Sequence, residues 1–211
     1  LKPGDKIAIL PFSGVAYQKP KKKVIISERD IQKTLKKLNI SEASPRFKII
    51  LRRLKERDLL PLTYNHPKLP YLLKIIGFLF GDGSMNFIGK RGDGVIHFSG
   101  KPEDLEKARE DIEKLGYTPS PIHCYQRKTI LRKKSYQCCS FAVNASSLLI
   151  LLETLGVPRG SKVNQPFRLP KWIFQCPLWQ KRLFLAALFG SEMRSPCPRK
   201  ERLGNFVAPS F

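Results

Sequence analysis

Residues 75–83 read IIGFLFGDG, and residues 185–193 read LAALFGSEM. Laid together without gaps, the two stretches form an apolar repeat in which small residues coincide at two positions. These pairs are Gly77 with Ala187 and Gly81 with Ser191. Residues four apart lie on one face of a helix, and small side chains on that face let two helix backbones approach closely. The repeat therefore predicts two helices that pack tightly against each other through these four residues.

Each half of the repeat also ends in an acid, Asp82 in the first and Glu192 in the second. Paired helices would bring these two carboxylates together at one end. Like charges at close range are costly unless a cation lies between them, and hard carboxylate oxygens suit Mg²⁺ or Mn²⁺. Such an ion could polarise a phosphodiester and generate hydroxide for in-line attack. Asp82 and Glu192 are thus the predicted metal ligands and catalytic residues.

At these residues the sequence resembles the LAGLIDADG homing endonucleases, in particular the intein-borne members with two motifs. The resemblance covers residues 72–193 and includes LGVPRGSK at 155–162 and LPKWI at 169–173, which look like the segment before the second motif. It implies that Lys162 lies in the active site, where an ammonium could polarise water or stabilise phosphorane charge. It also implies cleavage of both strands of a long, asymmetric DNA site.

Hydrophobic periodicity between the two halves of the repeat predicts an α+β fold with the order αββαββα. The expected helices span 72–81, 101–115 and 147–155, and the expected strands span 85–90, 95–99, 122–130 and 136–143. Gly116 and Gly156 follow the second and third helices, where a left-handed residue ends a helix. The pattern predicts an antiparallel sheet with helices on one face only.

Alternation along the strands predicts which residues lie on the open face of that sheet. If Ile96, Phe98, Phe141 and Val143 point toward the helices, then Val95 and a set of polar, aromatic and basic residues point away. With the basic turns between strands, they form the predicted DNA-binding set: Lys90, Arg91, His97, His123, Tyr125, Arg127, Lys128, Arg132, Lys133, Lys134, Tyr136 and Ser140.

The charge of the chain points to a polyanionic partner. Its 211 residues contain 39 Lys and Arg against 17 Asp and Glu, a formal charge of +22. A field of this size attracts nucleic acid strongly. Double-stranded DNA is the predicted partner, structured RNA stays open, and no apolar run is long enough to predict a membrane span.

Five cysteines without a C-x-x-C spacing argue against a disulfide framework and against a zinc knuckle. The sequence predicts free thiols in a reducing compartment, and so a cytoplasmic, intracellular protein.

The pattern divides the chain into four parts. Residues 1–23 resemble the end of an intein splicing module followed by a basic linker, which would make a host protein a partner in cis. Residues 24–70 predict a helical unit, either similar to a helix-turn-helix or a simple packing unit, with a connector. Residues 71–180 form the first half-domain, and 181–211 the second motif helix with a truncated tail.

Two departures from the family pattern bear on activity. The second motif has Glu192 and then Met193 where the family has Asp and Gly, and the 19 residues after Glu192 show no strand and helix pattern. The leading hypothesis is a metal-dependent DNA endonuclease of intein origin. The alternatives are a catalytically degenerate DNA-binding module of the same fold and an intron-RNA maturase.

Overall fold

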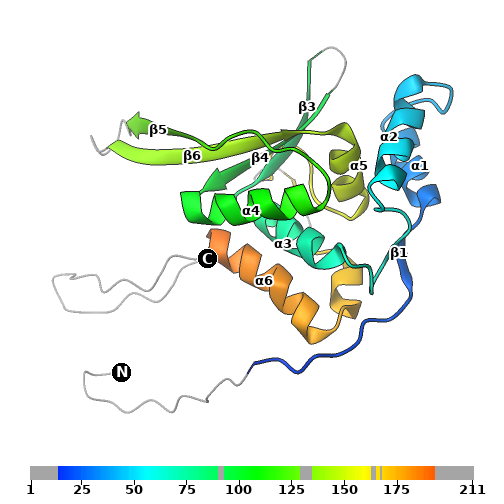
Figure 1. Cartoon of the computed structure of the whole chain (residues 1–211). Helices are drawn as coiled ribbons and strands as arrows, with labels where there is room; N and C mark the ends of the chain where they lie inside the picture. The colour runs from blue at the N-terminus through cyan, green and yellow to red at the C-terminus, as the bar shows by residue number, and fades with distance from the viewer. Residues whose placement is uncertain (1–13, 90–92, 129–134, 163–164, 167, 193–211) are drawn as a thin grey trace.

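The computed structural model of the chain describes residues 14–89, 93–128, 135–162, 165–166 and 168–192. Its centre is α3 (Leu69–Phe80), which is followed by β3 (Ser84–Ile88), β4 (Asp93–Gly100), α4 (Pro102–Lys114), β5 (His123–Lys128), β6 (Ser135–Asn144) and α5 (Ser146–Thr154). This is the predicted αββαββα order, and it confirms the α+β class (Figure 1). A 3₁₀ helix, η1 (Lys171–Gln175), leads into α6 (Leu178–Glu192), the second motif helix.

The four strands form one antiparallel sheet in the order β3-β4-β6-β5. Ile96 pairs with Val143, and Phe98 pairs with Phe141, whose ring stacks on it at 4.7 Å between centroids. All four side chains are buried, as the alternation predicts. Val95 differs from its prediction: its register places it on the open face, yet it is only 3% exposed, between the paired residues Asn86 and Asn144.

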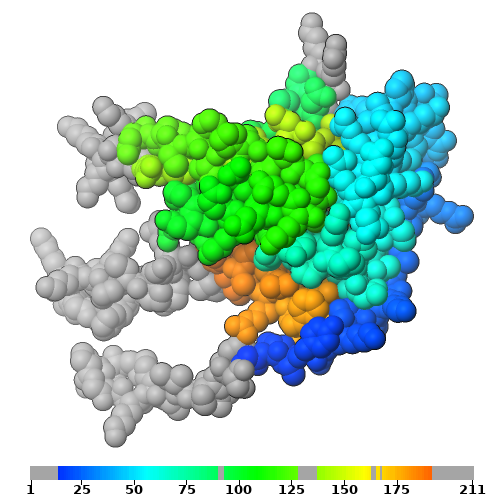
Figure 2. Space-filling model, viewed as in Figure 1, coloured from blue at the N-terminus to red at the C-terminus, as the bar shows by residue number. Residues whose placement is uncertain are grey.

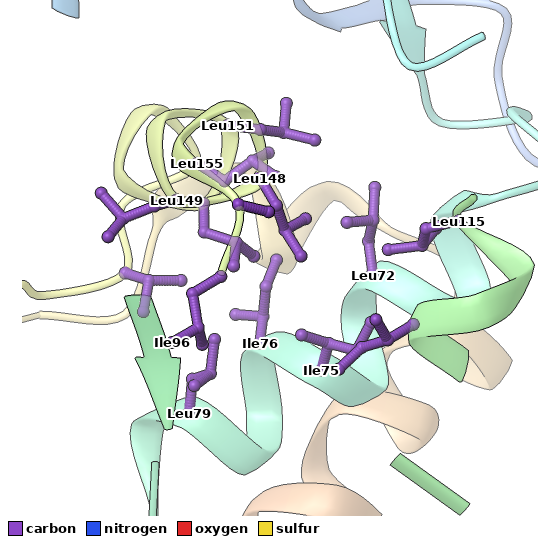
Figure 3. Packing of buried hydrophobic residues seen from close by; sticks show 14 of the residues in the cluster. Leu72, Ile75, Ile76, Leu79, Ile96, Leu115, Leu148, Leu149, Leu151 and Leu155 are labelled. Atoms are coloured by element: carbon purple, nitrogen blue, oxygen red, sulfur yellow. The ribbon is translucent and has the colours of Figure 1, made fainter. Parts of the chain in front are cut away.

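The helices α3, α4 and α5 cover the inner face of the sheet and enclose the main core. Leucines and isoleucines from α3 and α5 meet Ile96 of β4 in this core, and Leu115 closes it beyond the end of α4 (Figure 3). The α3 helix is buried along most of its length, because α6 packs on the side that faces away from the sheet.

Local signals set the helix ends. Asp30 accepts hydrogen bonds from the Ser27 hydroxyl at 2.7 Å and from the Ser27 amide at 2.9 Å, which lower the pKa of its carboxyl. These bonds form a capping box at the start of α1 (Glu28–Lys37). Gly116 and Gly156 adopt φ values of +89° and +98°, so the predicted left-handed helix ends are confirmed.

The helical unit before α3 consists of β1 (Val24–Ile26), α1, α2 (Pro45–Glu56) and β2 (Leu62–Thr63), with the two short strands paired. Buried residues of both helices belong to the same core cluster as α3 and α5, and Thr154 of α5 donates a 2.8 Å hydrogen bond to the Thr34 hydroxyl. Figure 1 shows α1 and α2 alongside α5. The unit therefore packs onto the half-domain, and α3 begins at Leu69, earlier than the predicted residue 72.

The prediction that all cysteines are free thiols is wrong. Cys124 and Cys139 are directly opposite on β5 and β6 and form a disulfide, with a Cα separation of 4.1 Å. Cysteine spacing along the chain gave no sign of the bond because strand register, not local sequence, brings the two residues together. Cys138 and Cys176 are free, and burial raises the pKa of Cys176 to about 11. Within the described ranges, none of the helices has the length and apolar character to cross a membrane.

Candidate metal centre and nucleic-acid interface

The contact between α3 and α6 depends on Gly77. A Cβ atom at this position would lie 2.3 Å from the Phe184 carbonyl oxygen and 3.0 Å from the Ala187 Cβ. No side chain larger than hydrogen fits at such a distance without moving backbone. The predicted pairing of Gly77 with Ala187 is therefore present. Ser191 lies one turn after Ala187, and its hydroxyl donates to the Leu188 carbonyl at 2.8 Å.

Asp82 lies in the turn that follows the last residues of α3, and its side chain is exposed. Gly190 and Ser191, in the last turn of α6, line the same cleft as Asp82. The helix pair thus brings the ends of both motifs together. Glu192 is the last residue of α6, and its side chain lies outside the part of the chain that the structure describes.

Lys162 lies at the end of α3, beside the residue that precedes Asp82. Its ammonium donates to the carbonyls of Leu79 and Phe80 at 3.2 Å each, and to the Gly81 carbonyl. A cation is favourable at a helix C-terminus, where unpaired carbonyls carry partial negative charge. Although 80 residues separate them in sequence, Lys162 and the turn that carries Asp82 are adjacent in the fold.

A cleft of about 1250 Å³ opens between α3, α4, α6 and the strands β5 and β6. In Figure 2 the orange surface of α6 meets the green surface of α4 along this side of the molecule. Three predicted DNA contacts, Tyr125, Arg127 and Ser140, line the cleft together with Asp82. The acid at the end of the first motif and part of the predicted DNA-binding set therefore share one concave surface.

Strand register places five of the predicted contacts on the open face of the sheet, because they alternate along their strands with residues that face the helices. These are His97, His123, Tyr125, Arg127 and Ser140. The two histidines, Tyr125 and Arg127 are exposed, and Ser140 is half-buried. Tyr136 pairs with Arg127, and Lys128 pairs with Ser135, but the side chains of Tyr136 and Lys128 lie outside the description. Lys90, Arg91, Arg132, Lys133 and Lys134 also lie outside the described residues.

The sequence patterns missed a group of charged residues on α3 and α4 that also line the cleft. Lys74 donates a 2.5 Å hydrogen bond to Asp111, which is 4% exposed. Burial raises the pKa of the Asp111 carboxyl, while the Lys74 ammonium opposes that rise. Lys101, Lys107 and Lys114 line the same wall. Periodicity assigns these lysines to the solvent side of a helix, and it cannot show that this side also faces a cleft.

The donor atoms at Asp82 fit a hard divalent cation in type. The exposed carboxylate supplies oxygen ligands of the kind that Mg²⁺ prefers, and Mg²⁺ usually keeps several of its waters. Among the described residues, no group of three or more His, Cys, Asp or Glu could hold a metal. One protein carboxylate is therefore described at this centre, and Glu192 is the predicted second.

No protein-family model matches the sequence. Similar segments occur in larger proteins. The chain is 34% identical over 198 residues to a tRNA-splicing ligase RtcB of Pyrococcus furiosus, covering 91% of this chain and 19% of that protein. It is 34% identical over 206 residues to the DNA-directed RNA polymerase subunit Rpo1N of Methanocaldococcus jannaschii, with coverage of 93% and 15%. A replication factor C small subunit of the same organism is 30% identical over 156 residues, with coverage of 71% and 8%.

The chain therefore spans no more than a fifth of the length of these relatives. Among solved structures, the homing endonuclease I-WcaI bound to its DNA recognition sequence aligns with a TM-score of 0.44 and 13% identity, over 76% of this chain and 62% of that one. The described residues form an αββαββα unit with a four-stranded antiparallel sheet, and α6 packs on α3 at Gly77, as the repeat of small residues predicts.

Proposed function

We propose that this chain is the endonuclease part of an intein and cuts both strands of a specific DNA site. The observation that carries the proposal is the close contact of α3 and α6 at Gly77, which brings the exposed Asp82 and the last turn of α6 to one cleft. Asp82 and Glu192 would hold Mg²⁺ or Mn²⁺ there.

Asp82 and Lys162 would have different roles in the reaction. A bound divalent ion supplies Lewis acidity and lowers the pKa of a bound water. Asp82 lines the cleft, and Lys162 keeps a positive charge next to the same turn. That charge would stabilise the phosphorane as negative charge develops during in-line attack.

The similarity to three differently named proteins supports the origin in an intein. Segments of 156 to 206 residues match at 30–34% identity in a ligase, a polymerase subunit and a replication factor, and each covers only 8–19% of the larger protein. Proteins with such different activities share a segment of this kind when it is an insertion and not part of their own machinery. A host protein would then carry this chain in cis.

DNA binding would use the open face of the sheet. Four exposed residues on this face offer hydrogen-bonding groups, and one of them offers an aromatic ring. They are His97, His123, Tyr125 and Arg127. From Lys114 to Ser191 the chain has 12 Lys and Arg and a single acid, Glu153, so the phosphate backbone meets little repulsion.

A second candidate function is DNA binding without cleavage. The specific observation in its favour is the second motif, in which Glu192 replaces the usual Asp and is followed by Met193. The longer side chain would place its carboxylate one methylene farther from the helix end. An RNA maturase of the same fold is distinguished by competition between duplex DNA and structured RNA.

The test replaces Asp82 by Asn. Loss of the carboxylate should reduce Mg²⁺-dependent cleavage by at least about 100-fold, while salt-sensitive DNA binding stays within about twofold. The matched control is Asp104→Asn, since Asp104 also lines the cleft but belongs to α4. Cleavage is measured on a library of duplexes that contains the natural insertion site. Equal cleavage by Asp82→Asn and the wild-type chain would remove the catalytic assignment, and binding without cleavage by the wild type would favour the second candidate.

A further inference from the structure

Residues 17–23, which we call the lysine segment, run along the molecule on the side of α6 (Figure 1). The segment reads YQKPKKK and contains no acid. Its four lysines are all exposed: Lys19, Lys21, Lys22 and Lys23. None of the four forms an ion pair with another described residue. The segment therefore presents four uncompensated positive charges to solvent.

Two hydrogen bonds fix the backbone at the two ends of this run of lysines. The Trp179 indole, at the start of α6, donates to the Gln18 carbonyl at 2.8 Å. The Tyr64 amide donates to the Lys23 carbonyl at 3.1 Å, and β1 then pairs with β2. Because the backbone is already anchored, a ligand that binds here has to order little more than the lysine side chains.

The elements that anchor the lysine segment bring no negative charge of their own. Residues 59–68, η1 and α6 as far as Ser191 contain no Asp or Glu. An uncompensated run of lysines attracts polyanions, and the release of condensed counterions adds to the affinity for nucleic acid. A polyanion is therefore the class of ligand that this surface favours.

An aromatic ring at the start of the segment narrows this class. Tyr17 is 73% exposed, and its ring centre lies 5.7 Å from that of Trp179 at a tilt of 30°. A nucleobase that stacks on the solvent side of Tyr17 would extend this aromatic pair, and such stacking contributes much of the affinity in single-strand binding. A duplex keeps the faces of its bases inside its own stack, so unpaired nucleotides are the ligands that can use this ring.

The lysine segment lies apart from the open face of the sheet. Figure 1 shows it in dark blue on the far side of α6 from the sheet, with α3 and α4 in between. In Figure 2 the blue surface adjoins the orange surface of α6. A strand bound at the lysine segment would therefore leave the proposed duplex surface free.

We propose that the lysine segment binds single-stranded nucleic acid. The lysines contact successive phosphates of the strand, and one base stacks on Tyr17. Contacts of this kind tolerate any sequence, because every base has an aromatic face. This gives the chain a second nucleic-acid surface, beyond the proposed cleavage of duplex DNA. Single-stranded DNA and RNA share the chemistry that the segment recognises, so the test includes both.

The first test measures binding of oligo(dT) and oligo(U), each of about 20 nucleotides, to the full chain over a range of salt concentrations. The variant Lys21→Gln/Lys22→Gln removes two charges from the lysine segment. The matched control, Lys37→Gln/Lys48→Gln, removes two exposed lysines from α1 and α2. Loss of two phosphate contacts should reduce the slope of log K against log salt by about 1.4. The control should keep the wild-type slope.

The second test addresses stacking. Tyr17→Ala should weaken binding about fivefold or more, while Tyr17→Phe, which keeps the ring, should stay within about twofold of the wild-type chain. An oligonucleotide that carries 5-iodouracil should cross-link to Tyr17 on irradiation. Tighter binding of oligo(dT) or of oligo(U) would identify DNA or RNA as the preferred source of the strand.

Three results would overturn the inference. The first is an equal loss of affinity in the two double lysine variants, and the second is unchanged binding by Tyr17→Ala. The third is displacement of the oligonucleotide by one equivalent of duplex, which would place the single strand on the sheet. If the wild-type chain binds neither oligonucleotide, the segment is not a nucleic-acid site and the inference is also wrong. None of these results changes the proposed endonuclease activity, which is tested separately by Asp82→Asn.

Discussion

At the scale of single residues, Gly77 has the clearest structural requirement. Its missing side chain allows the backbones of α3 and α6 to approach, and this approach places Asp82 and the end of α6 in one cleft. Lys162 shows the same dependence on neighbours, since its position beside Asp82 comes from three carbonyl oxygens at the end of α3.

Replacing Gly77 by Leu should separate the two motif helices. The new side chain would collide with the Phe184 carbonyl, and overpacking of this kind costs about 1–3 kcal/mol of unfolding free energy. Cleavage should fall more steeply than stability, because the two helix ends move apart. Urea unfolding and cleavage assays measure the two effects. Gly190→Leu is the matched control for stability, since a Cβ at Gly190 meets no atom within 4 Å. Equal loss of stability in both variants would contradict this account.

At the scale of elements, the β5 and β6 strands are joined twice, by their hydrogen bonds and by the Cys124–Cys139 disulfide. The two cysteines are 15 residues apart in sequence, so the bond restricts the unfolded chain over the residues between them. Two of the predicted DNA contacts, Tyr125 and Arg127, lie on β5 just beyond Cys124.

Reduction of this disulfide should destabilise the sheet. Closing a loop of 15 residues is worth about 3 kcal/mol, which corresponds to a melting temperature lower by about 6–12 °C for a chain of this size. Thermal melts with and without a reductant measure the difference, and Cys124→Ser should show the lower value in both conditions. Cys138→Ser is the control, since Cys138 is the adjacent free thiol on β6. A melting temperature that is insensitive to reductant would show that the two thiols are not joined in solution.

At the scale of the whole molecule, one apolar cluster runs from the helical unit through the half-domain to α6. It includes Ile31 and Leu35 of α1, the buried face of α3, and Phe184 of α6. The helical unit and the cleft therefore belong to one continuous body, and the cleft depends on how α6 packs against α3.

A continuous core predicts a single unfolding transition. Leu35→Ala removes a fully buried side chain, which should cost about 2–5 kcal/mol and shift the melting curve without splitting it. Ile49→Ala, on α2, should cost much less because Ile49 is 37% exposed. Far- and near-ultraviolet circular dichroism would report the same midpoint for each variant. A separate early transition in Leu35→Ala would show that residues 24–63 fold independently.

Local sequence determined most of the elements. The apolar periods and the glycines at 116 and 156 predict the order of the helices, and their ends within a few residues. The repeat of small residues predicts the α3–α6 contact, because helix pairing depends on side-chain size at a fixed spacing. The family resemblance directs attention to Asp82 and Lys162.

Tertiary structure alone decided the features that join distant segments. Strand register opposes Cys124 to Cys139 and buries Val95 on the open face, and neither follows from alternation within one strand. The charged wall of the cleft and the contact of Tyr17 with Trp179 also depend on contacts between elements. Sequence patterns predict local structure because the interactions within one helix or strand depend on neighbouring residues. The positions of two side chains far apart in the chain depend on how whole elements pack.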